Sequence, residues 1–363
     1  MMKKLFYVLL ITLLSSNLLA QDNICIGQKF SMHSLALGED RPYWVYLPPK
    51  YDDARYGKAS YPVIYLLDGD TNFMALAAIQ STFTRGMYNN MPECIIVAIP
   101  NTDRARDLTP TRSSLKHNGQ DLFTNSGGSS HFTSFLTSEL RNTIDSAYRT
   151  NGYNMLIGHS FGGLYVVTTL VRHTGSFNAY IALDPSLWWD NKVIYKEAQA
   201  IWNKTDFEKR YLYIAMAKDE NKADDIQKHS ETIDRFCTEV LKSAPGNNLN
   251  GAWKYYEDEN HGTILMPGMF DALRTIFDGI ELPVKEIPEN PGLIEEYYGK
   301  LSERLGFTFI PDENLIDNIG KYAVSVKKTE NAIKIFEYNL KNYPDSPNAK
   351  KSLSETREKL MNK

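Results

Sequence analysis

The chain has 363 residues, of which 42% are hydrophobic and 12% aromatic, and its formal net charge is −4 at pH 7. This composition is typical of a globular protein with a sizeable core, and the slightly acidic balance gives no electrostatic reason to expect nucleic acid as a partner. The three cysteines, Cys25, Cys94 and Cys237, have no paired spacing, which argues against a disulfide scaffold and against a structural zinc site.

The first twenty residues predict a secretory signal peptide. Lys3 and Lys4 give a positive start, residues 5–14 form an apolar run, and Leu18-Leu19-Ala20 provides a cleavage site before Gln21. The apolar run is too short to span a bilayer comfortably, and no stop-transfer segment follows it. We therefore expect a soluble protein exported to the periplasm or the medium, with no membrane anchor after processing.

Alternating segments open the mature chain and predict an antiparallel hairpin over residues 29–49. Short apolar runs then alternate with segments of helical periodicity, such as residues 131–148. The apolar runs are "YPVIYLLDG", "CIIVAIP", "NMLIGHS", "AYIALDP", "YLYIAMA" and "WKYYED". This alternation predicts an α/β fold, a mostly parallel sheet with helices on both faces, whose active site lies at the carboxyl ends of the strands.

The composition shifts after Ile280, where the proline-rich segment 281–292 indicates a linker. We expect one α/β domain over residues 21–282 and a small all-α extension over residues 283–363. The spacing in the extension partly matches the tetratricopeptide pattern, at Ile316, Ile319, Gly320, Ala323, Ala332, Phe336 and Pro344. A plain helical hairpin remains an alternative, and in either case we expect the extension to pack on the main domain or to form a homodimer or other protein contact.

The segment Gly158-His159-Ser160-Phe161-Gly162 matches G-x-S-x-G between a predicted strand and a predicted helix. A serine nucleophile at such a position needs a very sharp turn, and glycines on both sides prevent clashes there. A glycine-rich turn that merely contains a serine is the alternative. The strand before and the helix after favour Ser160 as the nucleophile, while His159 is expected to pack or orient the turn.

A serine nucleophile requires a base, and in this fold the base is a histidine late in the chain. His261 follows the last predicted strand and lies beyond every other histidine of the sequence. We expect the acid after the penultimate strand and favour Glu220, with Asp219 as a close competitor. Asp224 and Asp225 are more distant candidates.

The oxyanion of an acyl-transfer reaction needs two backbone N–H groups. One is expected from Phe161, the residue after the nucleophile, and the other from Asp70, in the turn that follows the third strand. Trp188 is a candidate wall of the substrate site, with core packing as its alternative. Arg104 and Asp107 are candidate substrate-binding residues, although an internal ion pair between them that shapes their loop is the favoured interpretation.

The motifs "YPVIYLLDGD", "AIPNTDRARDLTPT", "GHSFGG", "DPSLWW" and "NHGT" together resemble the esterase family of the α/β-hydrolase fold that includes enterochelin esterase and esterase D. The resemblance covers roughly residues 28–280. It implies a serine hydrolase acting on esters or thioesters, with Ser160 and His261 as nucleophile and base. Some members have a weak or absent third acid, which keeps a Ser–His dyad open.

The interpretation that follows is an exported serine esterase that works through an acyl-enzyme and needs no cofactor and no metal. Its substrate is expected to be a small-molecule ester, drawn from siderophore, aryl, acetylated polysaccharide or short-chain esters. Two alternatives stay open at the level of sequence. One is a binding protein on a hydrolase fold that has lost catalysis, and the other is a serine peptidase.

Overall fold

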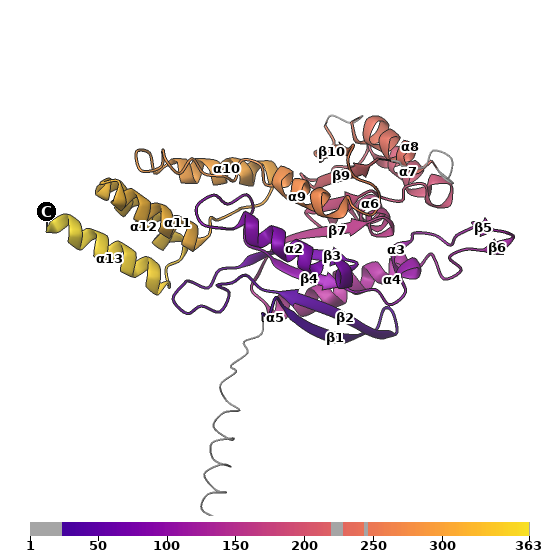
Figure 1. The fold of residues 1–363 in the computed structure, drawn as a ribbon, viewed down its shortest axis with the longest axis horizontal. Coiled ribbons are helices and arrows are strands. Elements are labelled where there is room, and N and C mark those ends of the chain that lie inside the picture. Colours follow the sequence, from indigo (N-terminus) through magenta and orange to yellow (C-terminus); the bar gives the residue numbers. More distant parts are fainter. Residues whose placement is uncertain (1–23, 219–227, 243–245, 363) are drawn as a thin grey trace, which may run out of the picture.

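The structure, a computed structural model, describes residues 24–218, 228–242 and 246–362. Its centre is an eight-stranded sheet with the order β1-β2-β4-β3-β7-β8-β9-β10 (Figure 1). The first two strands form an antiparallel hairpin, β2 pairs antiparallel with β4, and all further neighbours are parallel. The strands are β1 Gln28–Ser34, β2 Glu39–Tyr46, β3 Tyr61–Leu67, β4 Ile95–Ile99, β7 Thr150–His159, β8 Ala179–Leu183, β9 Tyr211–Ala217 and β10 Asn250–Tyr256. This arrangement confirms the predicted α/β fold with a mostly parallel sheet.

The connections between the strands are mainly helical. The helices before β10 are α2 Gly69–Phe83, α3 Arg104–Leu108, α4 Ser129–Ser134, α5 Arg141–Ala147, α6 Phe161–Arg172, α7 Trp189–Ile201 and α8 His229–Arg235. The later ones are α9 Leu265–Ile276, α10 Leu293–Leu305, α11 Glu313–Ser325, α12 Thr329–Asn342 and α13 Pro347–Met361. A small hairpin pairs β5 Lys116–His117 with β6 Gln120–Asp121, and short 3-10 and π-helical turns cover Thr174–Ser176, Phe135–Leu140 and Phe236–Leu241. No helix within the described ranges has the length and apolar character needed to cross a membrane.

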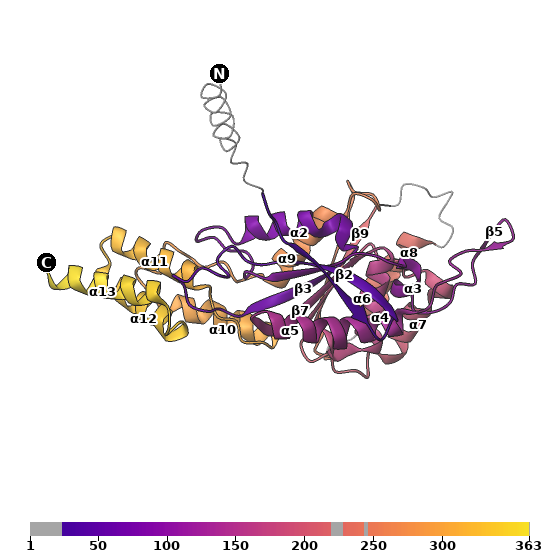
Figure 2. The same cartoon turned by 90° about the horizontal axis from the view of Figure 1, so that it is seen from below.

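Two apolar layers enclose the sheet because successive strand residues point to opposite faces. In β3, Val63 and Tyr65 belong to one buried cluster, whereas Ile64 and Leu66 belong to the other. Helices α2 and α9 cover the second face, and α4 to α8 cover the first, as Figure 2 shows for α2 and α9 on one side and α4 and α5 on the other. The sheet is therefore packed on both faces, which fixes the positions of the ends of its parallel strands relative to one another.

The segment predicted as a linker is packed rather than exposed. Val284 and Ile287 within it are buried, and Ile287 joins the cluster that also contains residues of α2 and α9. The same cluster extends into α10, α11 and α12, and Tyr153 of β7 packs edge-on against Phe309 with ring centroids 4.9 Å apart. The C-terminal helices thus lie against the hydrolase core, whereas their tetratricopeptide character and the domain boundary at residue 283 stay predictions.

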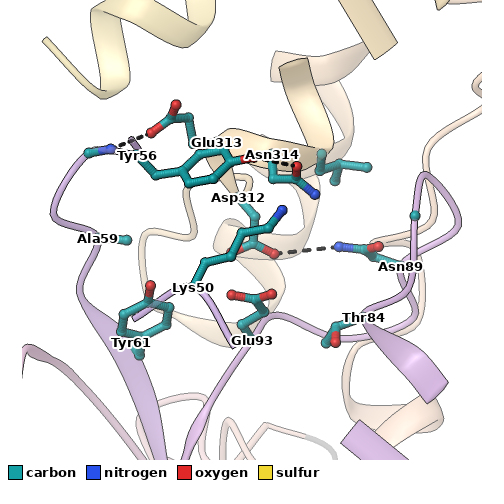
Figure 3. A pocket seen from close by; sticks show the side chains of 13 residues that line it. Lys50, Tyr56, Ala59, Tyr61, Thr84, Asn89, Glu93, Asp312, Glu313 and Asn314 are labelled. Carbon is teal, nitrogen blue, oxygen red and sulfur yellow. Dashed lines mark hydrogen bonds between the residues drawn. The ribbon is translucent and has the colours of Figure 1, made fainter. Parts of the chain in front are cut away.

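A polar pocket lies where the C-terminal helices meet the amino ends of the central strands. Figure 3 shows Lys50, Glu93 and Asp312 turned toward its interior, with Asn89 hydrogen-bonded to Asp312 at 3.4 Å. Burial raises the pKa of Asp312 from 3.8 to about 8, and the negative charge of Glu93 adds to the effect. Burial likewise raises the pKa of Glu93, which Lys50 opposes. The pocket therefore holds a carboxyl group that stays protonated in the folded protein at neutral pH.

This protonation makes stability dependent on pH. Between about pH 4 and pH 8 the folded protein retains a proton on Asp312 that the unfolded chain releases, so stability falls as pH rises through that window. Asp312→Asn, which needs no proton, is expected to flatten the decline in melting temperature between pH 5.5 and pH 8.5. The control is Asp52→Asn, because Asp52 is an exposed acid on the neighbouring loop. An unchanged pH slope in Asp312→Asn would contradict the assignment.

Candidate active site

Ser160 sits on a sharply strained turn between β7 and α6. Its backbone has φ 59° and ψ −114°, a conformation that residues other than glycine rarely adopt. A side chain at Gly158 would place its Cβ 2.4 Å from the carbonyl of Gly162, and one at Gly163 would place it 2.9 Å from Pro185 Cα. Close backbone approach thus requires glycine at positions 158 and 163, whereas a Cβ at Gly162 would lie 3.3 Å from Asp68 Oδ2. The turn lifts the serine to the carboxyl edge of the sheet.

A chain of hydrogen bonds runs from Ser160 through His261 to Asp184. Nε2 of His261 lies 3.1 Å from Ser160 Oγ, and Nδ1 of the same ring lies 2.6 Å from Asp184 Oδ2. Because a carboxylate can only accept, Nδ1 carries the proton and the lone pair of Nε2 faces the serine hydroxyl. This tautomer is the one that can take a proton from Ser160.

Asp184 is the buried end of this chain, with 2% of its side chain exposed. Burial by itself would raise its pKa, but hydrogen bonds from His229 and His261 outweigh burial and hold the pKa of Asp184 well below its usual range. Its Oδ1 accepts a hydrogen bond from the backbone N–H of Ala217 at 2.9 Å, and its Oδ2 accepts one from Nε2–H of His229 at 2.9 Å. The carboxylate is therefore charged and fixed, as an acid that orients a histidine must be.

The acid position differs from the sequence expectation. Glu220, together with Asp219, Asp224 and Asp225, lies outside the described residues, and the carboxylate found against His261 belongs to Asp184. Asp184 directly follows β8, one strand earlier than we expected the acid to lie. A signal was present in the run "AYIALDP", where an aspartate follows a buried strand as Ser160 follows β7.

The two predicted oxyanion donors lie at helix N-termini next to each other. Phe161 is the first residue of α6 and Asp70 the second of α2, so their N–H groups belong to first turns, which leave such groups without intrahelical acceptors. The strands that lead into these helices, β3 and β7, pair directly. Gly69 permits the tight turn, since a Cβ there would lie 2.5 Å from the backbone nitrogen of Ile99. The arrangement can direct both N–H groups toward a developing negative charge.

Arg104 connects these two turns. Its Nε donates to Asp68 Oδ1 at 2.6 Å, and its Nη2 donates to Asp68 Oδ2 at 3.1 Å. Nη2 also donates to the carbonyl oxygen of His159 at 3.0 Å. Asp68 immediately precedes α2, and His159 immediately precedes Ser160. The structure thus places Arg104 in the internal ion pair that the sequence analysis favoured, although its partner is Asp68 and not Asp107, which pairs with Arg41 and Arg106.

His159 holds the loop that carries His261. Its Nε2 donates to the carbonyl oxygen of His261 at 2.7 Å. Burial, together with the neighbouring His261, lowers the pKa of His159 to about 4, so its ring is neutral at physiological pH. A neutral ring with this contact orients the loop, in agreement with the structural role expected for His159.

Aromatic side chains cluster around Phe161, the residue that follows the nucleophile in the chain. The ring of Phe161 lies 5.1 Å from Trp189, 6.3 Å from Trp188 and 5.3 Å from Phe123, measured between centroids. Trp189 is fully buried and bonded to Thr111, so it supports the others, whereas Trp188 is half-buried and Phe123 is 38% exposed. Trp188 and Phe123 therefore belong to one aromatic cluster around Phe161. The role of Trp188 as a wall of the substrate site stays a prediction, and Phe123 is a further candidate that the sequence pattern did not single out.

One group of side chains in the described part of the chain has the composition of a metal site. Ligand atoms of Asp184, His229 and His261 all lie within 4.8 Å of one another. Each imidazole of the group donates to Asp184 Oδ2, and His261 also faces Ser160. These hydrogen bonds account for the cluster as a buried carboxylate held by two imidazoles, so the donor set needs no ion to explain it.

Comparison with known proteins agrees with this geometry. The family model described as "Putative esterase" matches residues 34–244, more than half of the chain. The solved structure of an IroE-like serine hydrolase from Shewanella oneidensis has a TM-score of 0.78 and 31% sequence identity, covering 86% of this chain and 99% of that one. These matches confirm both the α/β-hydrolase fold and the resemblance to serine esterases.

Two curated relatives are fungal. The siderophore enterobactin esterase of Emericella nidulans is 26% identical over 243 residues, 57% of this chain and 78% of the relative. The siderophore triacetylfusarinine C esterase of Aspergillus fumigatus is 29% identical over 173 residues, which are 44% of this chain and 56% of the relative. The family model matches more than half of the chain, and the serine hydrolase from Shewanella oneidensis is similar over 86% of it. The chain therefore belongs to the family described as "Putative esterase".

Proposed function

We propose that the protein hydrolyses carboxylic esters through an acyl-enzyme formed on Ser160. The observation that carries the proposal is the continuous hydrogen-bond chain from Ser160 Oγ through His261 to the buried Asp184. Ser160 Oγ attacks the ester carbonyl while Nε2 of His261 takes the hydroxyl proton, and Asp184 stabilises the resulting imidazolium. The backbone N–H groups of Phe161 and Asp70 bind the oxyanion.

Collapse of the tetrahedral intermediate breaks the bond to the alcohol oxygen, and His261 returns its proton to that leaving group. Water then attacks the acyl-enzyme, His261 accepts a proton from it, and the second collapse releases the acid and restores Ser160. All groups that these steps need are side chains or backbone amides of this chain. The reaction therefore proceeds without a cofactor in the proposed scheme.

The proposed substrate class is siderophore esters. The names of the two fungal relatives support this assignment, although the alignment covers only 56% of one of them. The aromatic cluster around Phe161 supports it as well, since the exposed parts of Trp188 and Phe123 offer flat apolar faces to a large ester beside Ser160. We further propose that the protein works outside the cytoplasm, on the basis of the signal-peptide pattern in residues 1–20.

The nucleophile and its acid can be tested with a fluorophosphonate probe and a p-nitrophenyl ester. Wild type is expected to be labelled and active, and Ser160→Ala is expected to lose both. Asp184→Asn keeps the geometry but disfavours the productive tautomer, so kcat is expected to fall by about 10⁴-fold. A wild-type protein that folds but neither labels nor turns over would refute the esterase proposal, and full activity in Asp184→Asn would refute the role of this acid.

The substrate class can be tested with a panel of siderophore triesters, feruloyl esters, acetylated sugars and acyl thioesters at equal concentrations. We expect kcat/KM to be highest for the siderophore esters, because several ester-linked units can contact the aromatic cluster at once. Trp188→Ala is expected to raise KM for these substrates about tenfold while leaving turnover of p-nitrophenyl acetate nearly unchanged. A preference for acetylated sugars by tenfold or more would replace the substrate assignment while leaving the esterase chemistry intact.

A further inference from the structure

His229 reaches the active site from a part of the chain that the reaction scheme above does not use. It is the first residue of α8, the helix that enters the fold after β9. Its Nε2 lies 2.9 Å from Asp184 Oδ2, and its ring stands perpendicular to that of His261, with 86° between the planes and 5.2 Å between the centroids. About a fifth of its side chain is exposed, so the imidazole lies largely within the protein.

Both histidines donate to one oxygen of the same carboxylate. Nδ1 of His261 meets Asp184 Oδ2 at 2.6 Å, and Nε2 of His229 meets this atom at 2.9 Å, while Oδ1 is held by the backbone N–H of Ala217. Three donors from three segments therefore define the plane of the carboxylate. If the donor from His229 is removed, Oδ2 keeps its bond to His261 and Oδ1 its bond to Ala217, so the carboxylate loses one of the three hydrogen bonds that the described residues give it.

The direction of this carboxylate matters because His261 is the more exposed partner. Half of the His261 side chain is exposed, whereas Asp184 is almost fully enclosed. The imidazole therefore takes its orientation from the carboxylate, and a shift of Oδ2 turns Nε2 away from Ser160 Oγ. Misplacement of a catalytic group by about an ångström can reduce the rate roughly a hundredfold.

We propose that His229 is a positioning residue for the hydrogen-bond chain Ser160–His261–Asp184. It donates its Nε2–H to Asp184 and thereby holds Oδ2 in line with Nδ1 of His261. The inference rests on the proposed esterase function. The positioning effect is due to the hydrogen-bond donor at the place of His229 Nε2, 2.9 Å from Asp184 Oδ2. A side chain that supplies an N–H there should replace histidine, and one that does not should fail even when it is polar.

The test compares His229→Gln, His229→Asn and His229→Ala in full-length protein, with kcat and KM measured on a p-nitrophenyl ester. Glutamine extends an amide N–H to about the position of Nε2, whereas the amide of asparagine is one methylene shorter. We expect His229→Gln to stay within about threefold of the wild-type kcat. His229→Asn and His229→Ala should each lose 10- to 100-fold in kcat, the effect of losing one hydrogen bond to a charged group. KM should change less than twofold in all three variants.

The matched control is His173→Gln, because His173 is an exposed histidine at the end of α6 and should leave both constants unchanged. The rate of fluorophosphonate labelling should follow kcat across the series, which reports on Ser160 activation independently of ester binding. Circular dichroism confirms folding, and the Gln–Asn pair remains decisive if the alanine variant does not fold.

Three results would overturn the inference. These are equal kcat in all three variants, equal losses in the glutamine and alanine variants, and losses that appear in KM instead of kcat. Failure of the esterase function itself has a different signature, since wild type would then show neither labelling nor turnover.

Discussion

The enclosed charge of Asp184 is the constraint on which the site depends. A carboxylate with 2% exposure persists as an anion only where hydrogen bonds replace its lost hydration, and here they come from the last residue of β9, the first residue of α8 and the loop after β10. Satisfying one carboxylate thereby brings three separate segments together at the carboxyl edge of the sheet. The position of His261 is a result of this requirement.

A second electrostatic link prepares the oxyanion side of the site. Arg104 joins Asp68, which precedes α2, to the carbonyl of His159, which precedes the nucleophile. Both helix N-termini are therefore held by one guanidinium before any substrate is bound. Preorganised donors of this kind need no reorganisation when charge develops, which is the condition under which they accelerate a reaction most.

The parts of this arrangement that sequence could predict are those encoded locally. The strand, the glycine pattern and the helix that surround Ser160 all lie within residues 150–172, and chain order points to His261. The acid could not be located in the same way, because Asp184 and His261 are 77 residues apart and only the pairing of β8 with its neighbours brings them together. We expected the acid after β9, whereas Asp184 follows β8.

Ion-pair partners were equally beyond sequence reasoning. Arg104 and Asp107 lie close in the chain and suggested a mutual pair, yet both lie in the short helix α3 and bond to different partners, Asp68 and Arg41.

For the fold, periodicity sufficed to predict the strands and the two-sided sheet. The proline-rich composition of residues 281–292 suggested a linker, and it could not reveal that Val284 and Ile287 are buried.

The apolar cluster shared by the central sheet and the C-terminal helices bears on how the chain matures. Tyr153, in the strand that carries Ser160 at its far end, is packed against Phe309, and Phe309 leaves the ribosome more than 150 residues later. Until then the apolar cluster beside α2 and α9 lacks its residues from α10 to α12, and Tyr153 of the nucleophile strand lacks its partner ring. The core around that strand is therefore completed only after these helices have been made, although the strands and helices that form the catalytic site come earlier in the chain.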